Sequence, residues 1–217
     1  MNKKVDAWEP HWEKKYSLGD KRKYLLPVMK KYDLGNRIVD VGSGHHPVTG
    51  FIDTLKEREA HPERKVIVLD IVWDENETLT NLRVRFDIED LLDATKISTR
   101  DVLSKWASFF GVDCQNPQDK RKVTAIIFSE ILNYVDTRNT LRSCFEYLES
   151  GGIFVIANHP TRGEEKNFSP NKLKSNNDLV DFLKEVLWCE ILEKVFPNGW
   201  ADEDQDLMLL VVRKREY

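Results

Sequence analysis

Two aspartates in the first half of the chain end short apolar runs at positions where they could hold a nucleoside, and a third lies just before a glycine-rich turn. Asp40 lies in IVDVGSG, Asp70 ends KVIVLD and Asp87 lies in VRFDIED. The glycines of Gly42-Ser43-Gly44 let the backbone turn sharply and approach a ligand closely. A carboxylate after the second run can accept hydrogen bonds from both ribose hydroxyls. Asp87 can accept from an adenine amine with Ile88 beside the base, although a helix-capping role explains this aspartate equally well.

A second set of polar residues follows two later apolar runs. Ser129, Glu130, Asn133 and Tyr134 come after AIIF, and Asn158 and His159 come after IFVIA. Glu130 can orient a substrate amine, and His159 can remove a proton near neutral pH. A structural or substrate-contacting His159 is the alternative. The two sets together predict a ligand site with a reaction centre beside it.

Two adjacent histidines, His45 and His46, extend the glycine turn and precede Pro47. Adjacent ligands alone do not make a metal site, and no nearby Cys/His cluster supplies the remaining ligands. We therefore predict no metal and interpret the pair as shaping the turn, with Pro47 starting the next helix.

The three cysteines, Cys114, Cys144 and Cys189, are scattered and lack a CxxC spacing. This argues against a disulfide framework and against a thiolate metal site. We interpret them as small residues in or near the core.

Apolar runs alternate with helix-like segments, which is the pattern of a parallel sheet covered on both faces. The predicted strands are 38–42, 65–73, 84–88, 124–132 and 152–159, and the helix-like segments between them are 48–59, 99–110 and 137–149. Gly151 and Gly152 are expected to end the last of these helices. The final runs, 188–197 and 206–216, read as an antiparallel hairpin.

Two loops and the amino-terminal segment depart from a minimal α/β unit. The polar residues 111–122 indicate an inert surface loop. The insertion 160–177 follows a strand end and is the better candidate for a lid over a substrate. We expect residues 1–34 to form a helical cap and 35–217 the main domain. Trp8, Trp12 and Tyr16 either cap a ligand and bind a substrate or dock this segment onto the core.

Composition indicates an ordinary globular protein and narrows its partners. The 217 residues are 41% hydrophobic and 32% charged, with a formal net charge of −4. This balance supplies no general basic field for nucleic acid. The sequence contains no apolar run of the roughly 18 residues that a membrane span needs, and its start lacks the apolar core of a signal peptide. We expect a cytoplasmic monomer or homodimer.

In their order, IVDVGSG, VIVLD, RFDIEDL, TAIIFSEILNYV and LESGGIFVIANH resemble the motifs of class I S-adenosylmethionine-dependent methyltransferases. The resemblance covers residues 38–217 and implies a doubly wound α/β fold with a mostly parallel seven-stranded sheet, an antiparallel carboxyl-terminal hairpin strand and helices on both faces. It implies S-adenosylmethionine as cofactor. The implied cofactor residues are Asp40, Gly42, Ser43, Gly44 and His46 at the methionine end, Asp70 and Ile71 at the ribose, Asp87 and Ile88 at the adenine, and Ser129 and Glu130 beside them.

By the same resemblance, His46 occupies the place of the turn's usual third glycine. Glu130 and His159 are the candidate catalytic residues, and the substrate would contact Trp8, Trp12, Asn133, Tyr134, Asn158 and His159. SEILNY is not the Asn-Pro-Pro-aromatic sequence associated with amino-directed methylation of DNA and protein glutamine. With the acidic balance, this favours methyl transfer to oxygen or nitrogen of a small molecule.

Three alternatives remain open. One is a methyltransferase of RNA or protein. Another is a nicotinamide-dependent oxidoreductase, which is less favoured because Pro47 takes the last glycine's place in G-x-G-x-x-G. The third is a non-catalytic module that binds an adenosyl ligand.

Overall fold

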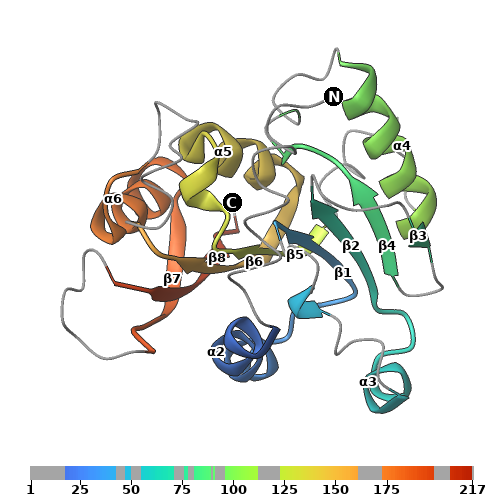
Figure 1. Ribbon diagram of the computed structural model, residues 1–217, viewed down its shortest axis with the longest axis horizontal. Coiled ribbons are helices and arrows are strands. Elements are labelled where there is room, and N and C mark those ends of the chain that lie inside the picture. The colour runs from blue at the N-terminus through green and yellow to red at the C-terminus, as the bar shows by residue number, and fades with distance from the viewer. Residues whose placement is uncertain are drawn as a thin grey trace.

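A central sheet lies between two layers of helices in the computed structural model (Figure 1). The structure describes residues 18–42, 47–49, 55–70, 76–77, 81–88, 90, 96–111, 123–160, 173–197 and 206–216. The strands are β1 (Arg37–Val41), β2 (Lys65–Asp70), β3 (Asn76–Glu77), β4 (Asn81–Arg85), β5 (Val123–Ser129), β6 (Leu148–Asn158), β7 (Cys189–Val195) and β8 (Met208–Lys214). The helices are α2 (Leu18–Lys31), α3 (Leu55–Ala60), α4 (Ile97–Phe110), α5 (Thr137–Tyr147) and α6 (Asn176–Asp181), with a 3₁₀ turn η4 (Leu132–Tyr134) and a π-helical turn η6 (Phe182–Val186).

The sheet has the predicted mixed topology. Within the described residues its strand order is β3-β4-β2-β1-β5-β6-β8-β7. Strands β4, β2, β1, β5 and β6 are mutually parallel, and β8 runs antiparallel between β6 and β7. The doubly wound fold with an antiparallel terminal hairpin is therefore confirmed. The two-residue strand β3, antiparallel to β4, adds to the seven strands that were predicted.

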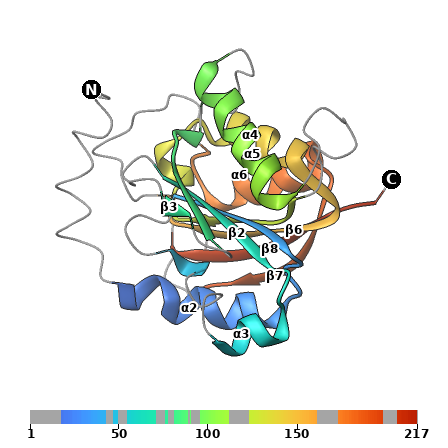
Figure 2. The same ribbon diagram turned by 90° about the vertical axis from the view of Figure 1, so that its right-hand side faces the viewer.

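Two hydrophobic cores lie on opposite faces of the sheet. Val39 and Val41 of β1 join α4, α5 and α6 in one cluster, whereas Ile38 joins α2 in the other. This alternation follows from the two-residue period of a strand. Figure 2 shows α2 and α3 on one side of the sheet and α4, α5 and α6 on the other.

The prediction that Gly151 and Gly152 end a helix is wrong. Helix α5 ends at Tyr147, and its last turn is closed by the Leu148 N–H, which donates to the carbonyl of Cys144. Leu148 already pairs with Val123 in the sheet, and Gly151, at φ +76°, lies inside β6 where the register with β5 shifts. The glycines serve a bulge in the strand, because β-bulges and helix ends both favour a residue that adopts positive φ.

Lysines from strands close the ends of two helices. Lys65 Nζ donates to the carbonyl of Phe109 at 2.5 Å, near the end of α4. The buried Lys214 Nζ donates to the carbonyls of Phe145 and Leu148, both at 2.7 Å, at the end of α5. Because a helix leaves its last carbonyls unpaired, these cations attach the helix ends to the sheet.

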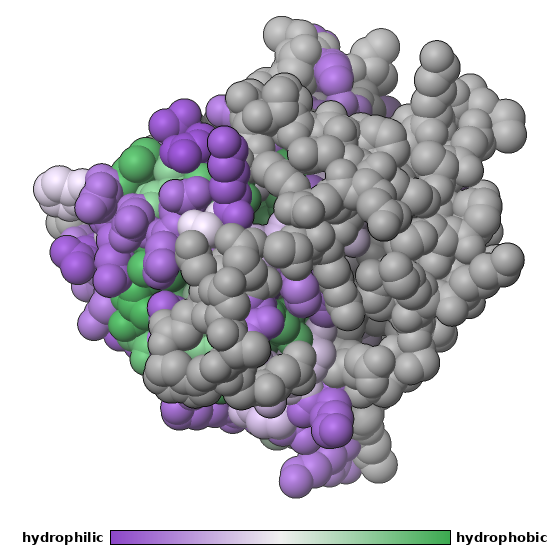
Figure 3. Space-filling view, turned by 60° about the vertical axis from the view of Figure 1, so that its left-hand side comes forward, coloured by the Kyte–Doolittle hydropathy of each residue, from purple (hydrophilic) through white to green (hydrophobic). Residues whose placement is uncertain are grey.

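Hydrophilic residues surround smaller hydrophobic areas on the side of the molecule that carries α6 and β7 (Figure 3). Among the described residues, the large hydrophobic side chains that are exposed are Val186 and Trp188.

Within all the residues that the structure describes, we found no helix that combines the length and the apolar character needed to cross a membrane.

Candidate functional site

The carboxyl ends of the parallel strands meet at one edge of the sheet, and the described candidate residues gather there. Val41 of β1 pairs with Leu69 of β2 and with Phe128 of β5, so these three strands end at the same level. The chain continues from β1 to one neighbour and later returns to the other, which makes this edge a topological switch point. Open α/β sheets bind ligands in the crevice at such a point.

Gly42 makes the turn at the end of β1. Its φ is +69°, and its N–H donates to the carbonyl of Leu69 at 2.9 Å. A Cβ built on Gly42 would lie 2.4 Å from the Cβ of Ile131, which real contacts do not allow. The glycine turn therefore packs directly against the segment that follows β5, so the two predicted parts of the site touch.

Asp40, two residues before Gly42, is completely buried. Its Oδ2 accepts hydrogen bonds from the Thr49 N–H at 3.2 Å and the Thr49 hydroxyl at 2.9 Å. The carboxylate thus fixes the chain where it resumes after the turn, a role that only the folded structure reveals. Contact between Asp40 and the methionine end of a cofactor stays a prediction.

The ends of β2 and β4 are tied together beside the turn. The Phe86 N–H donates to the Asp70 carbonyl at 2.9 Å, and the Asp90 N–H donates to the Asp87 carbonyl at 2.8 Å. The side chains of Asp70 and Asp87 are half-buried, whereas Ile88 is buried in the hydrophobic cluster on the α4 side. Two carboxylates therefore lie at adjacent strand ends, where the sequence predicted ribose and adenine contacts.

Glu130 follows β5 in an uncommon backbone conformation. Its φ is +60°, its side chain is buried, and its N–H donates to the carbonyl of Ala157 at 2.9 Å. Its Oε1 accepts a hydrogen bond from the hydroxyl of Tyr24 in α2. Sequence reasoning missed Tyr24, because no local pattern relates residues so far apart in the chain.

One polar residue after β5 contacts the backbone after β6. Asn133, in η4, donates through Nδ2 to the carbonyl of His159, and Tyr134 beside it is buried. The His159 side chain is half-buried at the end of β6. This bond brings Asn133 to the backbone of His159, although contact of either residue with a substrate stays a prediction.

Asn158 belongs to a chain of buried amides. Its Nδ2 donates to Asn176 Oδ1 at 2.9 Å, and Asn176 Nδ2 donates to the carbonyl of Asp206 at 2.7 Å. These bonds attach the end of β6 to α6 and to the segment before β8. Sequence reasoning missed Asn176, which lies at the end of the predicted lid 160–177 and is buried at the start of α6.

Several predicted residues lie outside the described residues, so their roles stay predictions. They are Trp8, Trp12, Tyr16, Ser43, Gly44, His45, His46 and Ile71, together with residues 161–172 of the predicted lid.

Two described cysteines contribute no nucleophile. Burial raises the pKa of Cys144 and of Cys189 to about 12 in each case. A thiol with such a pKa stays protonated near neutral pH, and the thiolate is the reactive form.

Among the residues that the structure describes, no three His, Cys, Asp or Glu side chains gather in a way that could hold a metal ion.

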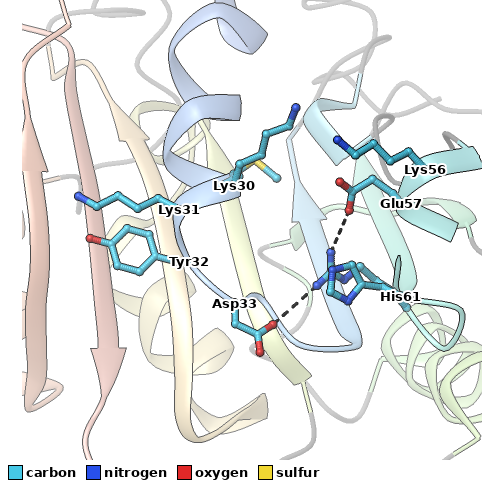
Figure 4. Close-up of a pocket in the computed structure, with 9 residues that line it drawn as sticks. Lys30, Lys31, Tyr32, Asp33, Lys56, Glu57 and His61 are labelled. Atoms are coloured by element: carbon cyan, nitrogen blue, oxygen red, sulfur yellow. Dashed lines mark hydrogen bonds and ion pairs between the residues drawn. The ribbon is translucent and has the colours of Figure 1, made fainter. Parts of the chain in front are cut away.

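A hollow of about 500 Å³ lies elsewhere, between the end of α2 and α3 (Figure 4). Arg64 contacts Glu57 at 3.4 Å and Asp33 at 3.7 Å there, and its Nε donates to the carbonyl of Gly35 at 2.9 Å. Burial lowers the pKa of Arg64, and the two carboxylates oppose this shift. Arg64 immediately precedes β2, so this hollow lies at the amino edge of the sheet, opposite the candidate site.

Solved structures resemble this chain over nearly its whole length. The N-methyltransferase NodS from Bradyrhizobium japonicum WM9, in complex with S-adenosyl-L-homocysteine, has a TM-score of 0.61 at 14% identity, covering 99% of this chain and 100% of that one. The 1,6-didemethyltoxoflavin-N1-methyltransferase of Burkholderia thailandensis, with bound 1,6-didemethyltoxoflavin and S-adenosylhomocysteine, has a TM-score of 0.59 at 11% identity, covering 98% of this chain and 85% of that one. The CurJ carbon methyltransferase has a TM-score of 0.52 at 15% identity, covering 90% of this chain and 53% of that one.

Sequence comparison adds no further relative: no protein-family model matches the chain, and no curated protein does. The structural likeness shows that this chain has the class I methyltransferase fold. A fold hosts many functions, and the residues of the site determine the reaction.

Proposed function

We propose that this protein transfers the methyl group of S-adenosylmethionine to an oxygen or nitrogen atom of a small molecule. One observation carries the proposal. The positive-φ turn at Gly42 lies at the switch point of a class I methyltransferase sheet, with the carboxylates of Asp70 and Asp87 at the next strand ends. This is the placement that an adenosyl ligand needs.

The described residues fit the cofactor in chemistry. The turn at Gly42 would receive its methionine end, and Asp70 and Asp87 would accept from its ribose hydroxyls and its adenine amine. When bound, S-adenosylmethionine supplies a methyl group on a sulfonium, which leaves as a neutral thioether. The protein then has mainly to align the acceptor with that methyl, and alignment can supply about 7 to 11 kcal/mol at best.

Glu130 and His159 lie on the acceptor side in this proposal. The Glu130 carboxylate would accept a hydrogen bond from the acceptor and hold its lone pair toward the methyl. An acceptor that arrives protonated needs a base, and His159, at the end of β6, would take that proton.

A small acceptor is supported by the net charge of −4 and by a segment SEILNY that lacks the Asn-Pro-Pro-aromatic motif. Of the similar structures, one holds 1,6-didemethyltoxoflavin, itself a small molecule. Another is a carbon methyltransferase, so the fold does not specify the acceptor atom. The second candidate is an RNA or protein methyltransferase, for which the lysines near the amino terminus would provide a docking surface.

Calorimetric titration with S-adenosylmethionine, S-adenosylhomocysteine and NAD tests the cofactor. We expect Asp70→Ala to weaken S-adenosylhomocysteine binding at least about tenfold, because a charge-assisted hydrogen-bond acceptor is lost. Asp101→Ala, exposed on α4, is the matched control and should bind like the wild type. Tight NAD binding without adenosyl binding would overturn the proposal and favour the oxidoreductase.

A second measurement separates the acceptor classes. Labelled methyl transfer is measured with the small-molecule filtrate of a cell extract and, separately, with the retained macromolecules. We expect label in the filtrate. Label confined to RNA or protein, with salt-dependent retention on RNA in the RNA case, would favour the macromolecular alternative, and adenosyl binding without any transfer would favour the non-catalytic module.

A further inference from the structure

We propose that Tyr24 is a positioning residue that fixes the carboxylate of Glu130, and that this pair selects an amine as the methyl acceptor. The inference rests on the proposed function and names the chemical class of its substrate. Its basis is the hydrogen bond from the Tyr24 hydroxyl to Glu130 Oε1, which joins α2 to the end of β5.

The backbone at Glu130 turns its side chain toward α2. Along β5, Ile126 and Phe128 belong to the cluster on the α4 side, whereas Ala125 and Ile127 belong to the cluster on the α2 side. Simple alternation would send Glu130 to the α4 side with Ile126 and Phe128. The φ of +60° interrupts the alternation, and the carboxylate meets Tyr24 from the opposite layer.

This conformation is unfavourable for a residue with a Cβ, so the surrounding structure must hold it. The Glu130 N–H is fixed by the carbonyl of Ala157 at 2.9 Å, and Oε1 is fixed by Tyr24. Non-glycine residues with positive φ cluster at functional sites. We therefore interpret the backbone conformation of Glu130 as one that holds its carboxylate in a fixed position.

Helix α2 is firmly anchored, so Tyr24 is presented from a fixed element. Leu25, Val28 and Met29 are buried against the sheet. At the last residue of the helix, Lys31 Nζ lies 2.9 Å from Glu193 Oε1 in β7. A side chain held by such an element can position another group accurately.

The position of Glu130 relative to the turn places it on the acceptor side. Ile131, the next residue, packs against Gly42, and Asn133 soon after it bonds to the carbonyl of His159. Glu130 therefore lies between the turn for the cofactor and the end of β6. In the proposed function the turn would hold the methyl donor and His159 would be the base, so Glu130 would lie between them.

The chemistry of a carboxylate favours an amine acceptor. A carboxylate only accepts hydrogen bonds, and each of its oxygens accepts more than one, so Tyr24 and an acceptor can bind it together. A hydroxyl and an ammonium both make a charge-assisted bond to a carboxylate, but the ammonium adds the attraction of opposite charges, which is stronger at a buried carboxylate than in water. One ammonium proton then passes to a base, and the freed lone pair attacks the methyl carbon as the carbon–sulfur bond breaks onto sulfur.

The test compares the wild type with Tyr24→Phe, Glu130→Gln, the double variant and Tyr32→Phe. Tyr32 directly follows the last residue of α2, eight positions from Tyr24, and serves as the matched control. Labelled methyl transfer is measured with the small-molecule filtrate, before and after acetylation of its amines. Affinity for S-adenosylhomocysteine is measured in parallel.

We expect Tyr24→Phe to lower the rate of methyl transfer, measured at a saturating amount of filtrate, about tenfold or more. Its affinity for S-adenosylhomocysteine should stay within twofold of the wild type. Tyr32→Phe should leave both quantities unchanged. The double variant should be no slower than Glu130→Gln, because Tyr24 acts through Glu130. Acetylation should remove the transfer.

Additive losses in the double variant, equal rates for Tyr24→Phe and Tyr32→Phe, or transfer that survives acetylation would each overturn this inference. A wild type that binds no S-adenosylhomocysteine would instead refute the proposed function itself.

Discussion

Replacing Gly42 by alanine tests the packing on which the site depends. Gly42 has φ +69°, and an added Cβ would lie 2.4, 2.5 and 2.8 Å from the Cβ, Cγ1 and Cδ1 of Ile131. The left-handed backbone costs a residue with a Cβ about 1–2 kcal/mol. Overpacking adds about 1–3 kcal/mol. We expect Gly42→Ala to lower the free energy of unfolding by about 2–5 kcal/mol, a large part of the roughly 5–15 kcal/mol that stabilises a folded protein.

Gly111→Ala is the matched control for this prediction. Gly111 has nearly the same φ, +68°, but nothing lies within 4 Å of the added Cβ. Its substitution should therefore cost only the backbone term of about 1–2 kcal/mol. Urea unfolding followed by circular dichroism measures both variants. Equal losses of stability in the two variants would refute the close approach of Gly42 to Ile131. They would also refute the packing of the turn against the segment that follows β5.

Two further predictions concern buried groups outside the candidate site. Lys214→Met keeps an apolar stem but leaves the carbonyls of Phe145 and Leu148 without their cation, so urea unfolding should show a loss of about 2–4 kcal/mol; unchanged stability would mean that α5 needs no such cap. With pKa values raised to about 12, Cys144 and Cys189 should resist iodoacetamide at pH 8 in the native protein and react after unfolding, as peptide mass spectrometry can show. Rapid labelling of either thiol in the native state would contradict its burial.

The alternation of strands and helices and the edge that carries the candidate site were predictable because they depend on local patterns. Strands such as β2 and β5 are continuous apolar runs, which is typical of strands buried on both faces. Parallel strands bring their carboxyl ends to one edge, so Asp70 and Asp87 could be placed from their positions alone. Their contacts with a cofactor stay predictions.

Other features depend on contacts that no local pattern contains. The Tyr24–Glu130 bond joins residues 106 positions apart. Gly151 is a positive-φ glycine after a helix, but pairing of Leu148 with Val123 determines that it lies in a bulge. The burial of Asp40 against Thr49 likewise becomes visible only once the chain is folded.

The position of β8 has a consequence for how the chain folds during synthesis. This strand lies between β6 and β7 and carries Lys214, which closes the end of α5, yet the ribosome makes residues 206–216 after every other described element. Until they emerge, β6 is an open edge of the sheet, with Phe154 and Ile156 in its length and its backbone groups unpaired on one side. Open apolar edges invite pairing with other chains. We therefore expect a nascent chain that stalls before residue 206 to depend on chaperones. Pairing of β8 with β6 should end this dependence.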